Sequence, residues 1–280
     1  MVVDEVASPA NVQEAMAFLK RRPDALPWAG GTLLLSDDQS WPKKSSVSIL
    51  DLHRIADFRH VHRSDRHLEL GSMVSLSTLL ALPKGSLLGP LRPAAMQLGT
   101  QALRNLATLG GNIASRWRFM TCFAALSCMD AAVELRDSGG VHWKGIHELV
   151  GQDGRPSIPM ATLLTRIRLP LAEWDSIATR PLGMAVFPQQ GAATFCACAR
   201  YAKGVIADLR IAIASTVLVR LREIETTLAG KRLPLSRKDV ESFCSSLALA
   251  TRELSGDDSL AEHAAVMSAA YLYHDAEYLT

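Results

Sequence analysis

Two glycine-rich strings constrain the fold of this chain more than any other feature of its sequence. Glycine has no Cβ, so at each string the chain can turn and bring its backbone close to a ligand. If the two strings lie opposite each other, they can present a ring of backbone N–H groups to a diphosphate. Each string taken alone also fits an ordinary turn. The first glycine string is Trp28-Ala29-Gly30-Gly31-Thr32-Leu33-Leu34, and the second is Arg104-Asn105-Leu106-Ala107-Thr108-Leu109-Gly110-Gly111-Asn112.

Composition and motifs exclude several classes of function. The chain has 280 residues, of which 48% are hydrophobic and 21% charged, as in a soluble globular protein with a real core. A net charge of +2 is too small to indicate a nucleic-acid-binding protein. Neither glycine string is G-x-G-x-x-G or a P-loop, so a Rossmann or Walker site is not supported. The start of the chain lacks the basic and apolar regions of a secretory signal. No stretch reaches the roughly 18 apolar residues of a membrane span. We therefore expect a cytoplasmic protein without nucleic-acid partners.

Metal and acid–base motifs are missing as well. The five cysteines lack iron–sulfur spacing, and the eight histidines form no metal-ligand pattern. No G-x-S-x-G or H-E-x-x-H motif occurs. Cys196 and Cys198 lie in an alternating stretch, so both thiols should point to one face of a strand as buried free cysteines. We therefore expect no metal site and no catalytic side chain, and any redox chemistry would need a cofactor.

Local patterns predict a mixture of helices and strands. A helix over 8–20, capped by Ser8 or Asn11, precedes the first glycine string, and a strand over 47–50 follows it. A helix over 113–129 begins right after the second string, where its N-terminal N–H groups would suit an anion. The other expected elements are hairpins over 58–61 with 67–70 and 131–136 with 141–143, helices over 76–82 and 93–99, a strand over 163–169, a connector over 170–181, strands over 194–201 and 209–214, and helices over 217–228, 236–249 and 260–278.

The full strings resemble a known family. Ala-Gly-Gly-Thr-x-Leu-Leu, followed by Arg-Asn-x-x-Thr-Leu-Gly-Gly-Asn-Ile-Ala, is similar to the FAD-binding (medium) subunit of molybdenum hydroxylases. That family includes the medium subunit of carbon monoxide dehydrogenase and the flavin domain of xanthine dehydrogenase. The likeness covers residues 7–170. Further similar segments, in chain order, are 8–15, 51–59, 70–76, 130–131 and 164–170.

The resemblance implies a fold and a site. The fold would be α+β, of the vanillyl-alcohol-oxidase/PCMH type, with FAD subdomains over 1–56 and 57–175 and a C-terminal sheet with helices over 176–280. FAD would lie between the first two parts, held by backbone donors and by the hydroxyls of Thr32 and Thr108. Arg104 would shape the second string or form a structural ion pair. Ile167 and Leu169 would lie against the flavin ring or in the core. The implied cofactor-binding residues are Ala29, Gly30, Gly31, Thr32, Leu33, Leu34, Arg104, Asn105, Thr108, Leu109, Gly110, Gly111 and Asn112.

The chain departs from the family pattern in two places. After Gly-Gly-Asn-Ile-Ala the family has a small-residue stretch ending in Asp, and here Thr121 stands at that point. Arg116 and Arg118 enter this segment, where they would meet a phosphate or form a solvated helix face. The segment 183–190 lacks the basic residue that the family tends to have. These differences bear on FAD affinity and on reaction with NAD.

The resemblance also implies a function. The chain would be a flavin-dependent, xanthine dehydrogenase-like oxidoreductase subunit. Electrons would come from iron–sulfur clusters on a 2Fe-2S subunit, which receives them from a molybdenum-cofactor subunit, and would leave through FAD to NAD or another acceptor. The first alternative is a structural or assembly subunit of the same fold with weak or lost FAD binding. The second is a stand-alone flavin oxidoreductase, which would need an acid or base of its own.

Overall fold

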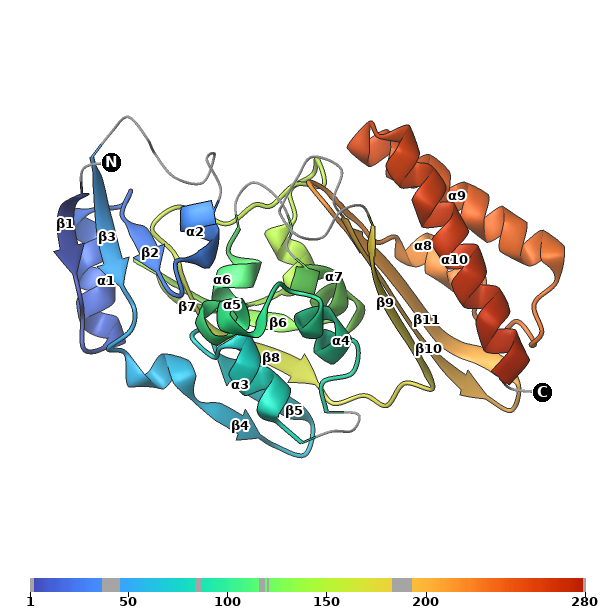
Figure 1. Ribbon diagram of the computed structural model, residues 1–280, viewed down its shortest axis with the longest axis horizontal. Helices are drawn as coiled ribbons and strands as arrows, with labels where there is room; N and C mark the ends of the chain where they lie inside the picture. The colour runs from blue at the N-terminus through green and yellow to red at the C-terminus, as the bar shows by residue number, and fades with distance from the viewer. Residues whose placement is uncertain are drawn as a thin grey trace.

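The computed structural model describes residues 3–36, 46–83, 87–115, 119, 121–182 and 193–278, with side chains as far as residue 273. Three β-sheets follow one another along the chain and along the long axis of the molecule (Figure 1). We call them the first, second and third sheets. The two ends of the chain lie at opposite ends of this row.

The first sheet is parallel and small. Its order is β1 (Val3–Ala7), β3 (Val47–Asp51), β2 (Leu26–Trp28), so the central strand comes last in the chain. Helix α1 (Val12–Arg21) begins at Asn11, whose side chain accepts the Glu14 N–H at 3.0 Å. The expected helix and the strand over 47–50 are therefore confirmed. Strands β1 and β2 were not predicted, because β2 has only three residues and the mostly exposed β1 contains Asp4 and Glu5 in place of an apolar run.

The second sheet is antiparallel and carries helices on one face. Leu70, Ile167 and Val133 align across its central strands and enter the core. Ile167 and Leu169 are fully buried there, so the core role is the correct one of the two expected for them. Strand order is β4 (Val61–Arg63), β5 (His67–Gly71), β8 (Leu163–Pro170), β6 (Ala132–Asp137), β7 (Gly140–Gly145), and the helices are η1 (Ala56–Arg59), α3 (Leu76–Ala81), α4 (Leu91–Met96), α5 (Gln101–Leu106), α6 (Leu109–Ile113), α7 (Thr121–Cys128) and η2 (Ile146–Leu149).

The predicted continuous helix over 113–129 is wrong. Thr108 caps α6, so the paired glycines of the second string lie inside this short helix, and α7 starts separately at Thr121. The cause is a threonine hydroxyl that accepts an N–H of the first turn, a local signal that starts a helix before the glycines. Residues 116–118 and 120, including Arg116 and Arg118, lie outside the described residues.

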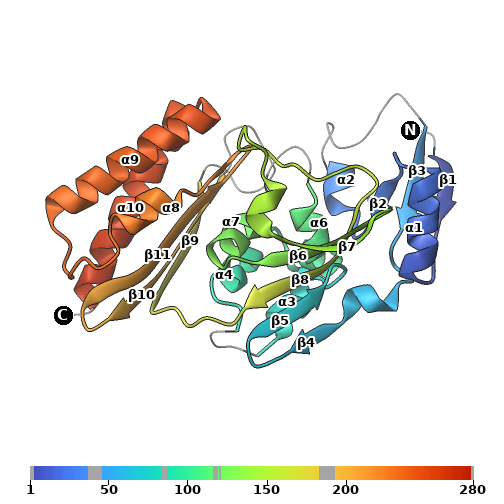
Figure 2. The same cartoon turned by 180° about the vertical axis from the view of Figure 1, so that it is seen from behind.

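The third sheet is packed between α7 and the C-terminal helices (Figure 2). Cys196 and Cys198 face the core under the second sheet, as the alternation predicted, whereas Phe195 and Ala197 face the C-terminal helices. The expected connector over 170–181 is wrong, because it contains edge strand β9, in which the consecutive exposed residues Arg180 and Pro181 break the alternation typical of a strand. The order is β12 (Leu218–Val219), β11 (Val205–Ala214), β10 (Ala193–Ala202), β9 (Ser176–Leu182), covered by α8 (Arg222–Thr226), α9 (Arg237–Ser255) and α10 (Asp258–Tyr278).

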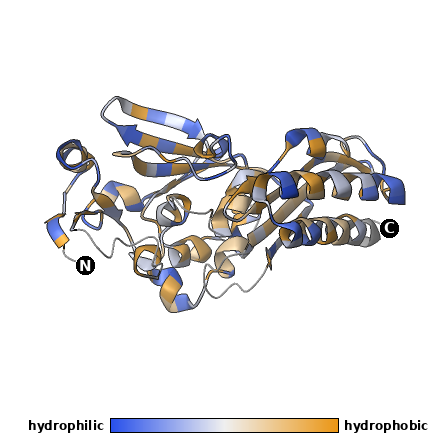
Figure 3. Ribbon diagram, turned by 90° about the horizontal axis from the view of Figure 1, so that it is seen from above, coloured by the Kyte–Doolittle hydropathy of each residue, from blue (hydrophilic) through white to orange (hydrophobic). Residues whose placement is uncertain are grey.

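Hydrophilic residues are interspersed along the two long C-terminal helices (Figure 3). Within the part of the chain that the structure describes, no helix is both long and apolar enough to cross a bilayer. Each sheet lies within one of the three parts expected from the sequence. The boundaries at 56 and 175 stay predictions, because sheet membership alone does not define independently folded units.

Candidate functional site

A cavity of about 380 Å³ lies where the three sheets meet, a volume in the range of small-molecule sites. Both glycine strings line it, together with the start of α7 and the strand ends of the third sheet. From the first string these are Ala29, Gly30, Gly31, Thr32, Leu33 and Leu34, from the second Ala107, Thr108, Gly110, Gly111 and Asn112, and from the third sheet Pro181, Leu182, Ala193, Thr194 and Ala214.

The two glycine strings face each other and touch. A Cβ built on Gly30 would lie 1.8 Å from the carbonyl oxygen of Leu106, so only glycine allows this contact between the two backbones. A Cβ on Gly111 would lie 4.0 Å from the Cβ of Ala29. The expected opposition of the strings is therefore present. Gly30 is therefore needed for the contact between the two strings.

The first string offers amide donors to the cavity. Gly31 has a φ of +67°, and helix α2 (Thr32–Ser36) starts directly after it. The first amides of a helix have no partner inside the helix. Among the described residues, the N–H groups of Gly30, Thr32 and Leu34 have no acceptor. These amides border the cavity and can donate to the oxygens of an anion.

Backbone donors were expected from residues 108–112 of the second string, and two groups of amides differ there. The N–H of Thr108, which lines the cavity, has no acceptor among the described residues, whereas the amides of residues 109–112 are already bonded inside the protein. All four of these amides donate within the protein, because α6 is capped by Thr108 and pairs with the segment 72–74. The bonds run from Leu109 N to Val74 O (2.9 Å), Gly110 N to Ser72 O (2.9 Å), Gly111 N to Thr108 Oγ1 (3.0 Å) and Asn112 N to Thr108 O (3.0 Å).

Three residues expected at the cofactor, Arg104, Asn105 and Leu109, do not line the cavity. Arg104 shapes the end of the preceding turn, where its Nη1 donates to carbonyl oxygens, the shortest bond being 2.6 Å to Gly99. Asn105 Oδ1 accepts the hydroxyl of Ser77 at 2.5 Å. Leu109 is fully buried in the core. These three residues were predicted at the cofactor because they lie in the second glycine string. In the folded chain their side chains pack away from the cavity.

Asn112 links the second string to the next helix. Its Oδ1 accepts the N–H of Cys122 at 3.0 Å, and both residues are buried. The bond holds α6 against the first turn of α7, which is the turn that carries Thr121 into the cavity wall. Thr121 therefore stands at the cavity, and the carboxylate of the family pattern is missing there.

Three polar atoms that sequence reasoning did not single out are buried at the cavity without a partner among the described residues. They are Ser72 Oγ, Ser115 Oγ and Gln97 Oε1. Ser72 and Ser115 are only 4% and 3% exposed. Buried polar atoms are nearly always hydrogen-bonded, so these three atoms are available to a polar ligand or to water in the cavity. No motif marks them, because their segments meet only in the folded chain.

The described lining contains one ionisable side chain, Asp24, which lies at the exposed end of the cavity wall. Among the residues that the structure places, no group of three or more His, Cys, Asp or Glu side chains is arranged to hold a metal ion. The segment 183–190, where the family tends to have a basic residue, is outside the described ranges.

The chain belongs to the family of the FAD binding domain in molybdopterin dehydrogenase, whose sequence profile matches residues 3–172. FAD is therefore its cofactor, and the resemblance noted from the glycine strings is confirmed. The cavity fits that cofactor, since it combines free amides, a glycine-built wall and unpartnered polar atoms.

Relatives with known names agree with this family. The chain is 24% identical over 248 residues to the xanthine dehydrogenase FAD-binding subunit of Escherichia coli O157:H7, which covers 85% of this chain and 82% of that protein. It is 25% identical over 154 residues to the nicotinate dehydrogenase FAD-subunit of Eubacterium barkeri, covering 54% of this chain and only 51% of that protein.

Solved structures have the same fold over nearly the whole chain, which confirms the expected fold class. Quinoline 2-oxidoreductase from Pseudomonas putida 86 matches with a TM-score of 0.80 at 19% identity, covering 99% of this chain and 98% of that one. Carbon monoxide dehydrogenase from Hydrogenophaga pseudoflava matches with a TM-score of 0.79 at 22% identity, covering 97% and 95%. At these identities the likeness concerns the fold alone.

Proposed function

We propose that this chain is the electron-transfer subunit of a molybdenum hydroxylase complex, in which FAD receives electrons from iron–sulfur clusters on a partner chain and passes them to NAD or another acceptor. The observation that carries the proposal is the cavity at the meeting of the three sheets, with donors on one wall and unpartnered polar atoms on the other. The family and the names of the relatives support the kind of complex.

The residues of the cavity divide into three roles under this proposal. The amides of Gly30, Thr32 and Leu34 donate to the diphosphate, with the Thr32 hydroxyl beside them. Ser72, Ser115 and Gln97 hydrogen-bond polar atoms of the cofactor that enter the interior. The ends of β9, β10 and β11 form an apolar wall that excludes water. Of the remaining residues predicted from the sequence, Ala29, Gly31, Leu33, Thr108, Gly110, Gly111 and Asn112 line the site.

FAD, when bound, supplies the electron-accepting and electron-releasing chemistry, and the chain orients and shields it. Acid–base catalysis by the chain is not part of this proposal, since Asp24 is the single ionisable side chain in the described lining. The molybdenum centre and the clusters belong to partner chains in this scheme.

A second candidate is a structural subunit that binds FAD weakly. Two observations favour it: Thr121 stands where the family has a carboxylate, and the amides of residues 109–112 in the second string are already bonded inside the protein. FAD affinity separates the two candidates.

The test begins with the absorption spectrum of the purified full chain and the identity of the cofactor released on denaturation. Flavin bands with FAD near one per chain are expected. Ser72→Ala should weaken FAD binding about fivefold, the effect of losing one hydrogen bond of about 1 kcal/mol. Ser268→Ala is the matched control, because Ser268 is also buried without a partner for its hydroxyl but lies on α10, away from the cavity.

A colourless chain that takes up no added FAD would favour the structural subunit. The partners are tested separately, by purifying the chain from its native cells and measuring metals. Molybdenum and iron in constant ratio to FAD are expected. FAD without either metal would contradict the proposed complex and favour a stand-alone flavoprotein.

A further inference from the structure

Three of the five cysteines lie together at the junction of α7 and β10. Cys128 ends α7, while Cys196 and Cys198 are on the face of β10 turned toward it. All three are fully buried. The Cys128 thiol donates to the carbonyl oxygen of Cys196 at 3.5 Å, so it lies against the strand that carries the other two thiols. We call these residues the thiol cluster.

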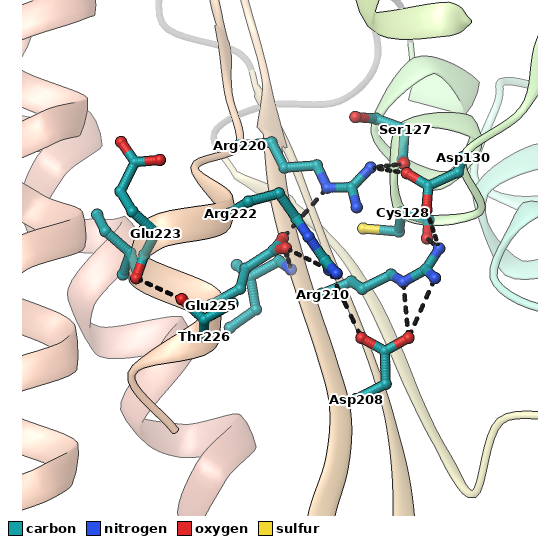
Figure 4. A network of polar contacts seen from close by, with 12 residues as sticks. Ser127, Cys128, Asp130, Asp208, Arg210, Arg220, Arg222, Glu223, Glu225 and Thr226 are labelled. Atoms are coloured by element: carbon teal, nitrogen blue, oxygen red, sulfur yellow. Dashed lines mark hydrogen bonds and ion pairs between the residues drawn. The ribbon is translucent and has the colours of Figure 1, made fainter. Parts of the chain in front are cut away.

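Two arginines of the third sheet reach the same point, as Figure 4 shows. Arg210 Nη1 donates to the carbonyl oxygen of Cys128 at 2.8 Å, and Arg220 Nη1 contacts the carbonyl oxygen of Ser127. Both guanidinium groups also contact the carboxylate of Asp130 at 2.6 Å. The end of α7 is thus covered by two cations that the third sheet supplies.

These neighbours make the three thiols unequal. Burial acts to raise the pKa of the Cys128 thiol, but its hydrogen bonds with Cys196 and Cys198 and the charges of Arg220 and Arg210 outweigh burial and lower that pKa well below its ordinary value. Burial, together with the adjacent Cys128, raises the pKa of Cys196. A thiolate is the nucleophilic form of cysteine, and the lowered pKa favours that form at Cys128 over the two strand thiols.

The two remaining cysteines serve as internal references. Burial raises the pKa of Cys122 to about 12 and that of Cys244 to about 11, with no other cause in either case. Both are buried free thiols, as the members of the thiol cluster are. Comparing Cys128 with these two cysteines therefore separates the effect of burial on the thiol pKa from the effect of the neighbouring thiols and arginines.

We propose that the thiol cluster is a peroxide-sensitive dithiol, in which Cys128 forms a disulfide with Cys196 or Cys198 across the junction between α7 and the third sheet. In the first step the Cys128 sulfur attacks hydrogen peroxide, an S–O bond forms, the O–O bond breaks and water leaves. In the second step the strand sulfur attacks the Cys128 sulfur, the S–S bond forms, the S–O bond breaks and a second water leaves. Two thiols are oxidised and one peroxide is reduced.

The dithiol lies close to the cavity without being part of it. Thr179 Oγ1 contacts Cys196 Sγ at 3.8 Å, and the carbonyl oxygen of Thr179 accepts Gln97 Nε2 at 2.7 Å. Gln97 lines the cavity. A disulfide here would fix β10 against α7, and both elements carry residues of the cavity wall. The inference rests on the thiols alone and does not depend on the proposed function.

The test treats the reduced, folded full chain with hydrogen peroxide, then alkylates the remaining thiols in denaturant and digests with trypsin. Mass spectrometry should find the peptide 119–136, which contains Cys122 and Cys128, joined to the peptide 169–200, which contains Cys196 and Cys198. The cross-link should persist in Cys122→Ser and Cys244→Ser and disappear in Cys128→Ser. Either Cys196→Ser or Cys198→Ser should keep it, and the double variant should lose it.

Several results would overturn the proposal. These are alkylation of all five thiols after peroxide treatment, a cross-link that survives in Cys128→Ser, or a bond between Cys196 and Cys198 alone. Circular dichroism before treatment ensures that each variant is folded. If Cys128→Ser does not fold, the double variant Cys196→Ser/Cys198→Ser replaces it, because it removes both possible partners of Cys128. A cross-link to peptide 119–136 that persists in this double variant would also overturn the proposal.

Discussion

Gly30 lies so close to Leu106 that a Cβ on this glycine would be 1.8 Å from the Leu106 carbonyl oxygen. The first glycine string is thereby seated against the second, backbone on backbone. The cavity wall depends on this contact, because both strings continue directly into the lining residues.

Gly30→Ala should force the two strings apart. A contact of this kind with a backbone atom cannot be relieved by a rotamer change, so we expect destabilisation by about 1–3 kcal/mol and a loss of FAD affinity of at least tenfold. Urea unfolding and FAD titration measure the two effects. Gly139→Ala is the control, because a Cβ there would meet only side-chain atoms of Asp137 and His142 on an exposed hairpin. Unchanged FAD affinity in Gly30→Ala would contradict the role given to the contact.

Gly111→Val tests whether the space between the strings holds the cofactor. A Cβ at Gly111 would lie 3.0 Å from Thr108 Oγ1 and would point toward Ala29, and the branched methyl groups would occupy the cavity edge. We expect a folded protein that retains less than a tenth of the wild-type FAD. FAD content after gel filtration and circular dichroism are the measurements. A folded variant with full FAD content would place the cofactor elsewhere.

Asn112→Ala should destabilise the protein more than Asn105→Ala. Loss of Asn112 Oδ1 leaves the buried N–H of Cys122 without its acceptor, at a cost of about 1–3 kcal/mol. Asn105 Oδ1 accepts only an exposed hydroxyl, that of Ser77, which can turn to water. The comparison uses urea unfolding of the two variants. Equal losses would mean that the link between α6 and α7 does not support the fold.

Arg220→Ala should remove a buried ion pair. The Arg220 and Glu225 side chains are 9% and 3% exposed, and Nε of the arginine lies 3.2 Å from Oε1 of the glutamate. Breaking a buried pair costs about 3–5 kcal/mol. We expect a loss at the lower end of that range, because Glu225 keeps the more exposed Arg222, whose Nη1 lies 3.0 Å from the Glu225 Oε2, and the N–H of Ile211. Arg237→Ala breaks the exposed pair with Glu241 and should cost about 0.5 kcal/mol or less. Thermal unfolding of both variants measures the two losses of stability. A small effect of Arg220→Ala would mean that Arg220 does not hold the end of α7 against the third sheet.

Asp51 should make stability depend on pH at the acid end. Burial acts to raise its pKa, but hydrogen bonds from the backbone and ring of His53 and from the Ser8 hydroxyl outweigh burial and lower the pKa below 3.8. The stabilisation is therefore present above the unfolded value and is lost as the pH falls through the lowered pKa.

Urea unfolding at pH 6 and pH 3 measures this effect. Asp51→Asn should be less stable than wild type at pH 6, and the difference should shrink at pH 3. Asp153→Asn, a change at an exposed carboxylate, is the control and should leave the pH dependence of wild type intact. A constant difference between Asp51→Asn and wild type at both values would mean that the charge of Asp51 does not contribute.

Part of this structure could be predicted from local sequence. Asn11 and Ser75 begin helices because a short polar side chain before an apolar run accepts the free N–H of the first turn. Cys196 and Cys198 face one way because side chains alternate along a strand. Local signals failed where pairing in the folded chain makes the element, as at β9, an edge strand whose exposed residues Arg180 and Pro181 are consecutive.

The sequence by itself determined the family, the cofactor and the two strings that border the cavity, because these depend on residue types in a fixed order. Only the tertiary structure decided how the strings are used. The amides of residues 109–112 bond to Thr108 and the segment 72–74, Arg104 donates to carbonyl oxygens, and Ser72, Ser115 and Gln97 converge on the cavity. Hydrogen bonds between residues far apart in the sequence form only when the fold brings them together, so local sequence patterns do not predict them.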